Sequence, residues 1–353
     1  MDFMVSTVDM GLFCIFLLVL LCPFFIKKVE EQLEAFLFVM GVSAVTIANA
    51  WHLELVIEAV EEPIMKGIVP AVLVAGLIFY YGRSHAKRIM DVLLDKIPLK
   101  ILVFLIVVIL GLSASLITAI IAALVLVEVV SLMPLDRNTK IKLTVVACFS
   151  IGLGAALTPV GEPLSTIAIT KLQGPPYHAG FFFLLENIGV YIIPGVLAFG
   201  ILSAFIVGKK TDVKETDIFA RGGDTLRDVG IRGAKVYLFV MALLLLGSGF
   251  KIIIDTYLIH IPAMILYWVN MSSAVLDNAT LTAAEIGPSM DIFQIKAILM
   301  GLLVSGGMLI PGNIPNIISA NKMGITSKEW ARTGVPIGLV AMLVYFVWLF
   351  YLH

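Results

Sequence analysis

Two carboxylates, Glu162 and Asp277, stand inside long apolar segments of this 353-residue chain. An ionisable side chain at membrane depth is costly unless it is paired, hydrated or used in transport, so both are candidate functional groups. No lysine or arginine stands at the same depth in these segments. Hydroxyl and amide side chains occur beside them and at matching places in the other half of the chain: Ser113, Ser115, Thr118, Thr158, Ser165, Ser273, Asn278, Thr280, Thr282, Asn313 and Asn316.

Oxygen ligands of this kind suit sodium or protons better than soft metals. Desolvation favours a protonated carboxyl and a bound cation favours an ionised one, so cation binding can release a proton. The sequence therefore predicts Asp277, Asn278 and Glu162 as sodium ligands, with Asp277 and Glu162 binding a cation and protons competitively. The alternative is a structural carboxyl that only holds its loop by hydrogen bonds, and Glu162 fits this alternative better than Asp277 does. Glu128 and Glu285 are weaker candidates because they lie toward the ends of their segments.

Two segments each carry a pair of prolines four residues apart, Leu157 to Pro163 (LTPVGEP) and Leu309 to Pro315 (LIPGNIP). Proline removes an amide donor and crowds the preceding turn, so both segments are predicted to interrupt their helices. The freed carbonyls could coordinate a cation, and the half-helix N-termini offer amide donors to an anion. The alternative is a simple kink whose carbonyls are satisfied by neighbouring side chains.

The two interruptions belong to a repeat. Ser113 to Val125 (SASLITAIIAALV) matches Ser273 to Glu285 (SAVLDNATLTAAE), and Gly154 to Pro163 matches Gly306 to Pro315 in the same order. The segments 99–134 and 256–288 are predicted to enter the membrane, turn at their polar centres and leave on the side that they entered. Polar and proline-broken segments at corresponding places of two halves are typical of the binding site of a secondary transporter.

Composition places these elements in a membrane. Hydrophobic residues make up 60% of the chain and charged residues 14%, which excludes a large soluble domain. The first apolar segment is followed by Lys27 and Lys28, so it is predicted to be a retained helix and not a signal peptide. Three cysteines, Cys14, Cys22 and Cys148, lie in apolar runs and are expected to be buried and unbridged.

Basic residues predict the orientation. With Lys27 inside, only Lys66, Lys171, Lys251 and Lys296 of the 24 lysines and arginines fall outside, as the positive-inside rule requires. The protein is then predicted to lie in the cytoplasmic (inner) cell membrane, with both termini on the extracytoplasmic side. Three crossings separate the two hairpins, so the repeats are predicted to be inverted.

The predicted organisation has five parts. Residues 1–98 form scaffold helices and an interfacial helix at Ser84 to Ile97, for which a simple loop is the alternative. Residues 99–207 hold the first hairpin, broken helix and following helix, 208–234 form a cytoplasmic linker, 235–255 a scaffold helix, and 256–353 the second hairpin, broken helix and last helix. The fold class is thus an all-α polytopic membrane protein with inverted repeats.

The motif Ser273 to Asn278, followed by Gly306-Gly307 and Gly312 to Asn316, resembles the ion transporter superfamily, most closely its NhaD-type sodium/proton antiporters and ArsB-type permeases. Within it the chain resembles a short family described as cation transporters. The resemblance implies an elevator-type transporter, a homodimer in membrane lipid, in which the hairpins and broken helices move against a scaffold. In the first half, Leu164 stands at the position of Asn316, with Ser165 beside it, so two symmetric sodium sites are not expected.

The predicted function is a sodium (cation)/proton antiporter that works by alternating access. The alternative is a sodium-coupled symporter of a small anion, and a third reading is a channel. No HExxH, GxSxG, Walker or dinucleotide-binding motif occurs in the sequence, so neither an enzyme, nor a bound cofactor, nor a nucleic-acid partner is expected.

Overall fold

The computed structural model describes residues 6–65, 94–208, 226–253, 262–276 and 278–352, with positions 68–70, 72–74, 77–78, 81, 88, 92 and 256. Regular structure in these residues is helical throughout. Five described helices are long and apolar enough to cross a membrane: Thr7–Phe25, Leu99–Ile117, Phe183–Ile206, Val229–Ile253 and Ser327–Tyr351. The all-α fold is confirmed, and these helices support a multi-pass membrane protein.

Large apolar side chains cover the outside of the helices. Phe25, Phe205 and Val340 are 80%, 74% and 64% exposed, a degree of exposure suited to lipid rather than water. The expectation of three buried cysteines was wrong for Cys14, which is exposed on α1 (Thr7–Phe25), whereas Cys148 is buried. The reason is that α1 lies at the edge of the molecule and packs with one side only.

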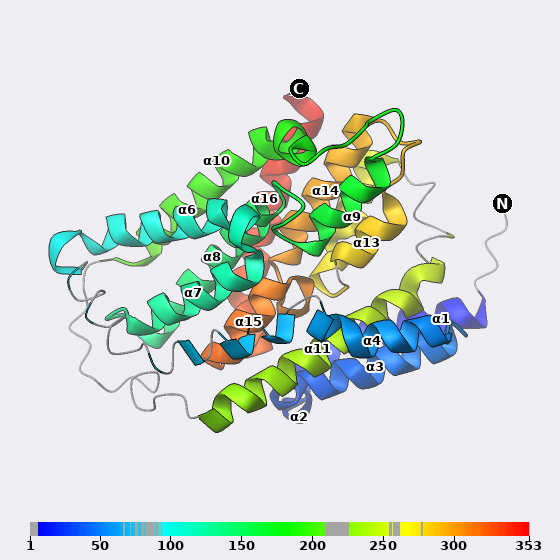
Figure 1. The fold of residues 1–353 in the computed structure, drawn as a ribbon, viewed down its shortest axis with the longest axis horizontal. Coiled ribbons are helices and arrows are strands. Elements are labelled where there is room, and N and C mark those ends of the chain that lie inside the picture. Colours follow the sequence, from blue (N-terminus) through cyan, green and yellow to red (C-terminus); the bar gives the residue numbers. More distant parts are fainter. Residues whose placement is uncertain are drawn as a thin grey trace.

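One layer of the molecule consists of α1, α3 (Leu33–Ile47), α4 (Leu53–Met65) and α11 (Leu226–Ile253), at the lower right of Figure 1. The short α2 (Lys27–Glu31) joins the first two. Helix α11 packs against α3 and α4. Helices α11 and α3 approach closely at Gly249, where an added Cβ would lie only 2.6 Å from the Cβ of Ala44. Small residues commonly line such close helix contacts in membranes.

The first half of the remaining body contains α6 (Leu99–Ile117), α7 (Ala119–Leu132), α8 (Arg137–Ala155), α9 (Pro163–Leu172) and α10 (Phe183–Ile206). Helices α6 and α7 form a hairpin that turns at Thr118, in the middle of the molecule (Figure 1). The sequence predicted a turn at this polar centre, and the chain turns there.

The second half contains α12 (Ala263–Val269), the 3-10 turn η2 (Asn270–Ala274), α13 (Asn278–Glu285), α14 (Ile292–Gly306), the 3-10 turn η3 (Ile310–Gly312), α15 (Ile314–Met323) and α16 (Ser327–Tyr351). Helix α8 is buried at every residue from Leu143 to Ala155, and α14 at every residue from Ala297 to Gly306. Helices buried on all faces form the centre of a fold, and each of these two leads directly into one of the proline-containing segments.

The helices of the two halves also pack across one another. Helix α7 packs against α15, and α13 packs against α9. Within the halves, α6 packs against α8, and α12 and η2 pack against α14.

Some predicted features lie outside the described residues. These are Asp277, most of the interfacial helix at Ser84 to Ile97, and the linker from 209 to 225. Helix α11 begins at Leu226, within the predicted linker that ends at residue 234. The helix continues past its apolar stretch through residues that carry charges, such as Arg227, which apolar patterning does not detect.

Candidate functional site

The first interruption separates α8 from α9 between Ala155 and Pro163, as the proline pair predicted. Thr158, 4% exposed, donates its hydroxyl hydrogen bond to the backbone oxygen of Ser115 near the end of α6. The amide of Ala119, just past the hairpin turn, donates to the oxygen of Gly161 at 2.9 Å. The interruption and the tip of its own hairpin are therefore joined by two hydrogen bonds, one from each side.

Thr118 at that tip has φ 75°, which a β-branched residue rarely adopts. Its side chain accepts from the amide of Ile121 at 3.4 Å. Because the turn is strained, it depends on the contacts that bind it to the interruption, above all the bond from Ala119 to Gly161.

The second interruption separates α14 from α15, with η3 between them. Asn316 is fully buried, and its Nδ2 donates to the oxygens of Gly306 and Leu309, both at 2.8 Å. Ser305 donates to the oxygen of Asn270 at 2.7 Å, and Ser273 donates to the oxygen of Leu302 at 3.3 Å. This interruption is thus held by side chains of α14, α15 and η2. Both proline-containing segments are confirmed as breaks rather than kinks.

Glu162 and Asn313 occupy the same place in the two breaks. Each is the extended residue immediately before its half-helix, with φ −156° in both cases, and neither side chain caps the helix that follows. Both are buried, at 6% and 5% exposed. The first turns of α9 and α15 therefore present amide donors without a side-chain cap.

The two breaks lie close to each other. A Cβ on Gly152 of α8 would be 2.6 Å from Nδ2 of Asn313. Four residues earlier, Cys148 contacts the hydroxyl of Ser319 on α15 at 3.3 Å. A larger residue at position 152 would therefore require the Asn313 side chain to move.

The remaining predicted residues divide into three groups. Ser113 and Ser115 donate to carbonyls of their own helix, at 3.4 Å and 2.8 Å, and Thr282 donates to the oxygen of Asn278 at 2.8 Å. Ser165 and Asn278 are 0% and 4% exposed, and Ser165 Oγ and Asn278 Nδ2 have no hydrogen-bond partner among the described residues. Asp277 and the side chain of Thr280 lie outside the described part.

A cavity of about 740 Å³ lies between the α1–α3–α4–α11 layer and the two breaks. On one side it is lined by Glu58, Glu61 and Glu62 of α4. On the other side it reaches Pro163 and Ile314, the first residues of α9 and α15. An acidic wall therefore faces the beginnings of both half-helices across one space.

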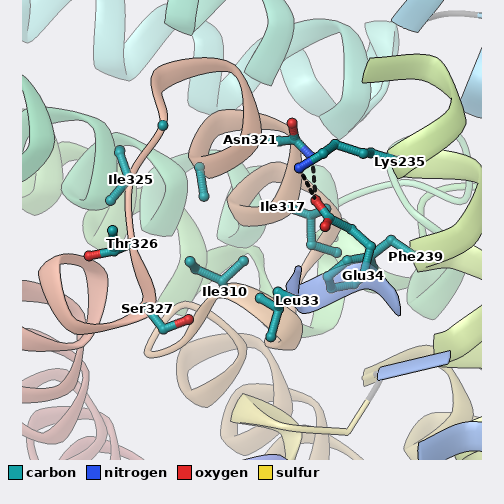
Figure 2. Close-up of a pocket in the computed structure, with 12 residues that line it drawn as sticks. Leu33, Glu34, Lys235, Phe239, Ile310, Ile317, Asn321, Ile325, Thr326 and Ser327 are labelled. Carbon is teal, nitrogen blue, oxygen red and sulfur yellow. Dashed lines mark hydrogen bonds and ion pairs between the residues drawn. The ribbon is translucent and has the colours of Figure 1, made fainter. Parts of the chain in front are cut away.

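A second, smaller cavity of about 200 Å³ lies between α3, α11 and α15 (Figure 2). Oε1 of Glu34 accepts from Nδ2 of Asn321 at 2.8 Å and from Nζ of Lys235 at 3.5 Å. Figure 2 shows Asn321 and Lys235 converging on Glu34 from α15 and α11. This polar contact joins the helix after the second break to the neighbouring layer.

Two features were missed by sequence reasoning. Glu128 forms an ion pair with Lys322, linking α7 to α15. Glu285, ranked low because it lies at the end of its segment, is only 2% exposed and accepts from Nδ2 of Asn270 at 2.9 Å. The sequence does contain a signal for the pair of Asn270 and Glu285. Both are polar, whereas Leu110 and Val125 at the matching positions of the first half are apolar.

A family model described as "Protein of unknown function (DUF1646)" matches residues 9–352. A search of curated proteins returns no match. Because the match spans nearly the whole chain, the chain belongs to this family.

Proposed function

We propose that this member of the DUF1646 family is a secondary active transporter that exchanges sodium, or another monovalent cation, for protons. The observation that carries the proposal is that both half-helices begin at one cavity, with buried Glu162 and Asn313 immediately before them. Broken helices that meet inside a bundle of apolar helices are a typical binding site of secondary transporters.

The packing supports the inverted repeats and alternating access. The second arm of each hairpin packs against the half-helix that follows the other break, α7 against α15 and α13 against α9. Exchanging the two halves exchanges these two contacts, as a two-fold relation between the halves requires. The layer of α1, α3, α4 and α11 stands to one side, where an elevator needs its scaffold; a homodimer stays a prediction.

The cavity supports a cation as the transported ion. In the orientation predicted from the basic residues, α4 faces the outside, so Glu58, Glu61 and Glu62 would line the outer entrance. A wall of one charge in a low-dielectric cleft raises the local concentration of ions of opposite charge. The carboxylate of Glu162 and the amide oxygen of Asn313 then supply oxygen ligands of the kind that sodium prefers.

The test is cation-dependent pH change inside liposomes that contain the purified protein, with sodium, lithium and potassium in turn. We expect a pH change that Asp277→Asn and Glu162→Gln both abolish. Glu186→Gln is the matched control, because Glu186 is exposed on α10. If Glu162→Gln transports normally while Glu162→Ala unfolds more easily, Glu162 is a structural carboxyl.

One observation favours the second candidate, a sodium-coupled carrier of a small anion. The uncapped amides at the starts of α9 and α15 are suited to an anion. A folded wild-type protein that gives no pH change with any cation, but takes up a small carboxylate or oxyanion only with sodium, would replace antiport with symport.

A further inference from the structure

The buried pair of Glu285 and Asn270 is not among the residues assigned to the cation. Glu285 is 2% exposed at the end of α13, and Asn270 is fully buried at the start of η2. Asn270 Nδ2 donates to Oε2 of Glu285 at 2.9 Å. Two oxygens of the pair remain, Oε1 of Glu285 and Oδ1 of Asn270. Both are buried without a hydrogen-bond partner among the described residues.

One proton satisfies both of these oxygens. A carboxylic acid and a primary amide can form a cyclic pair in which the amide N–H donates to one carboxyl oxygen and the carboxyl O–H donates to the amide oxygen. The first of these two bonds is present. A proton on Oε1 of Glu285 supplies the second bond, to Oδ1 of Asn270, and removes a buried negative charge.

No described residue of the surrounding helices forms an ion pair with Glu285. Helix α13 packs against α9, α11 and α14, and η2 carries no charged residue. Lys171 of α9 reaches α13, where it donates to the backbone oxygen of Ala283. Within the described part of the chain Glu285 forms no ion pair. The charged residues of the three helices are Lys171, Arg227, Asp228, Arg232, Lys235, Lys251 and Lys296.

The pair is connected to the second break. The backbone oxygen of Asn270 accepts from the hydroxyl of Ser305 at 2.7 Å. Ser305 precedes Gly306, whose oxygen accepts from Asn316 at 2.8 Å. A change at Glu285 can therefore reach the backbone of the second break through Asn270, Ser305 and Asn316.

The first half shows that packing alone does not require a polar pair here. Leu110 and Val125 stand at the positions that match Asn270 and Glu285, and both are apolar. The corresponding hairpin and helix, α6 and α8, pack closely without such a pair. The pair of Glu285 and Asn270, which has no polar counterpart at the matching positions of the first half, thus indicates a role other than support.

We propose that Glu285 and Asn270 form a proton-binding site in which Glu285 carries the proton exchanged for the cation, a role that rests on the proposed antiport. On protonation the O–H bond forms at Oε1 with a proton from the solution. On release the proton returns to the solution, and two acceptor oxygens are left side by side. Glu285 is the last residue of α13, so its route to the solution passes the end of the helix.

The decisive variant is Glu285→Gln, because a glutamine amide can make both bonds to Asn270 and so imitates the protonated pair. Infrared difference spectra between acidic and alkaline pH report the C=O stretching band of a protonated carboxyl. We expect this band in the wild type and in the control Glu186→Gln, and its loss in Glu285→Gln. Transport by Glu285→Gln should fall at least tenfold, while its melting temperature and its stabilisation by sodium stay at wild-type values.

Three outcomes are distinguishable. If the wild type shows no cation-dependent proton movement but the band titrates and disappears in Glu285→Gln, the antiport fails and the proton site stands. If Glu285→Gln exchanges ions at the wild-type rate, or if the band is unchanged by the substitution, the proton site is refuted. If Asn270→Leu combined with Glu285→Val, the residue types of the first half, transports normally, the pair is structural and the proposal is equally refuted.

Discussion

Replacing Asn316 is predicted to destabilise the protein, because this one side chain binds two backbone groups of the second break. Its amide donates to the oxygens of Gly306 and Leu309, and the residue is fully buried. In the variant Asn316→Leu, leucine has nearly the same shape as asparagine, and it is the residue at the matching position of the first half, Leu164. Both donated hydrogen bonds are lost, and two buried carbonyls are left without this donor.

The magnitude follows from these two bonds. Leaving a buried polar group unsatisfied costs about 1–3 kcal/mol. Two such groups, offset in part by the apolar contacts of leucine, give an expected loss of about 2–4 kcal/mol in the free energy of unfolding. Asn187→Leu is the matched control, because that amide makes a single bond, to the oxygen of Phe183 within its own helix at 2.8 Å. It should cost less than about 1 kcal/mol.

Trp330 provides the assay. Its buried indole donates to the oxygen of Gly307 at 3.2 Å, so its fluorescence reports on the second break directly. Unfolding in detergent micelles by a denaturing surfactant can be followed by this signal, with Trp330→Phe to assign it. An unfolding free energy of Asn316→Leu within about 0.5 kcal/mol of the wild type would contradict the role given to these two bonds.

Two further predictions concern the entrance and the start of α8. Replacing Glu58, Glu61 and Glu62 with glutamine should raise the cation concentration for half-maximal transport about three-fold at low salt, and this difference should vanish at high ionic strength; Glu54→Gln, on the same helix but not in the lining of the cavity, is the control. Asp136 caps α8, and its hydrogen bond with the Thr139 side chain is the main cause that lowers the pKa of its carboxyl. The stabilisation is therefore complete above the ordinary pKa and is lost as the pH falls through the lowered one. Asp136→Ala should cost about 1 kcal/mol at neutral pH and become indistinguishable from the wild type in acid, as pH-dependent melting would show.

Local backbone chemistry explains what the sequence predicted well. The breaks at Pro159 and Pro311 follow from proline pairs inside apolar segments, and the turn at Thr118 follows from a polar centre in an apolar run. Both effects act within a few residues. They do not need knowledge of what packs against the segment.

Contacts between distant segments could not be predicted in this way. The ion pair of Glu128 with Lys322 and the contact of Glu34 with Asn321 each join residues far apart in the chain. The burial of Glu285 could not be predicted either, because it results from the packing of α13 against α9, α11 and α14. Burial of a segment end depends on neighbouring helices that hydropathy does not place.

The two halves share their packing but not their chemistry. Four residues of the second half, Asn270, Asn278, Glu285 and Asn316, each carry a buried polar atom without a partner among the described residues, and in the first half Ser165 and Ser203 do so as well. Their first-half counterparts are Leu110, Thr118, Val125 and Leu164. Native proteins satisfy nearly all buried polar groups, so four such atoms at positions where the first half has three apolar residues and a threonine indicate groups kept for a ligand rather than for the fold. The first half then contributes Glu162 and a firmly bonded break, while the second half contributes the oxygens that an ion and a proton could share.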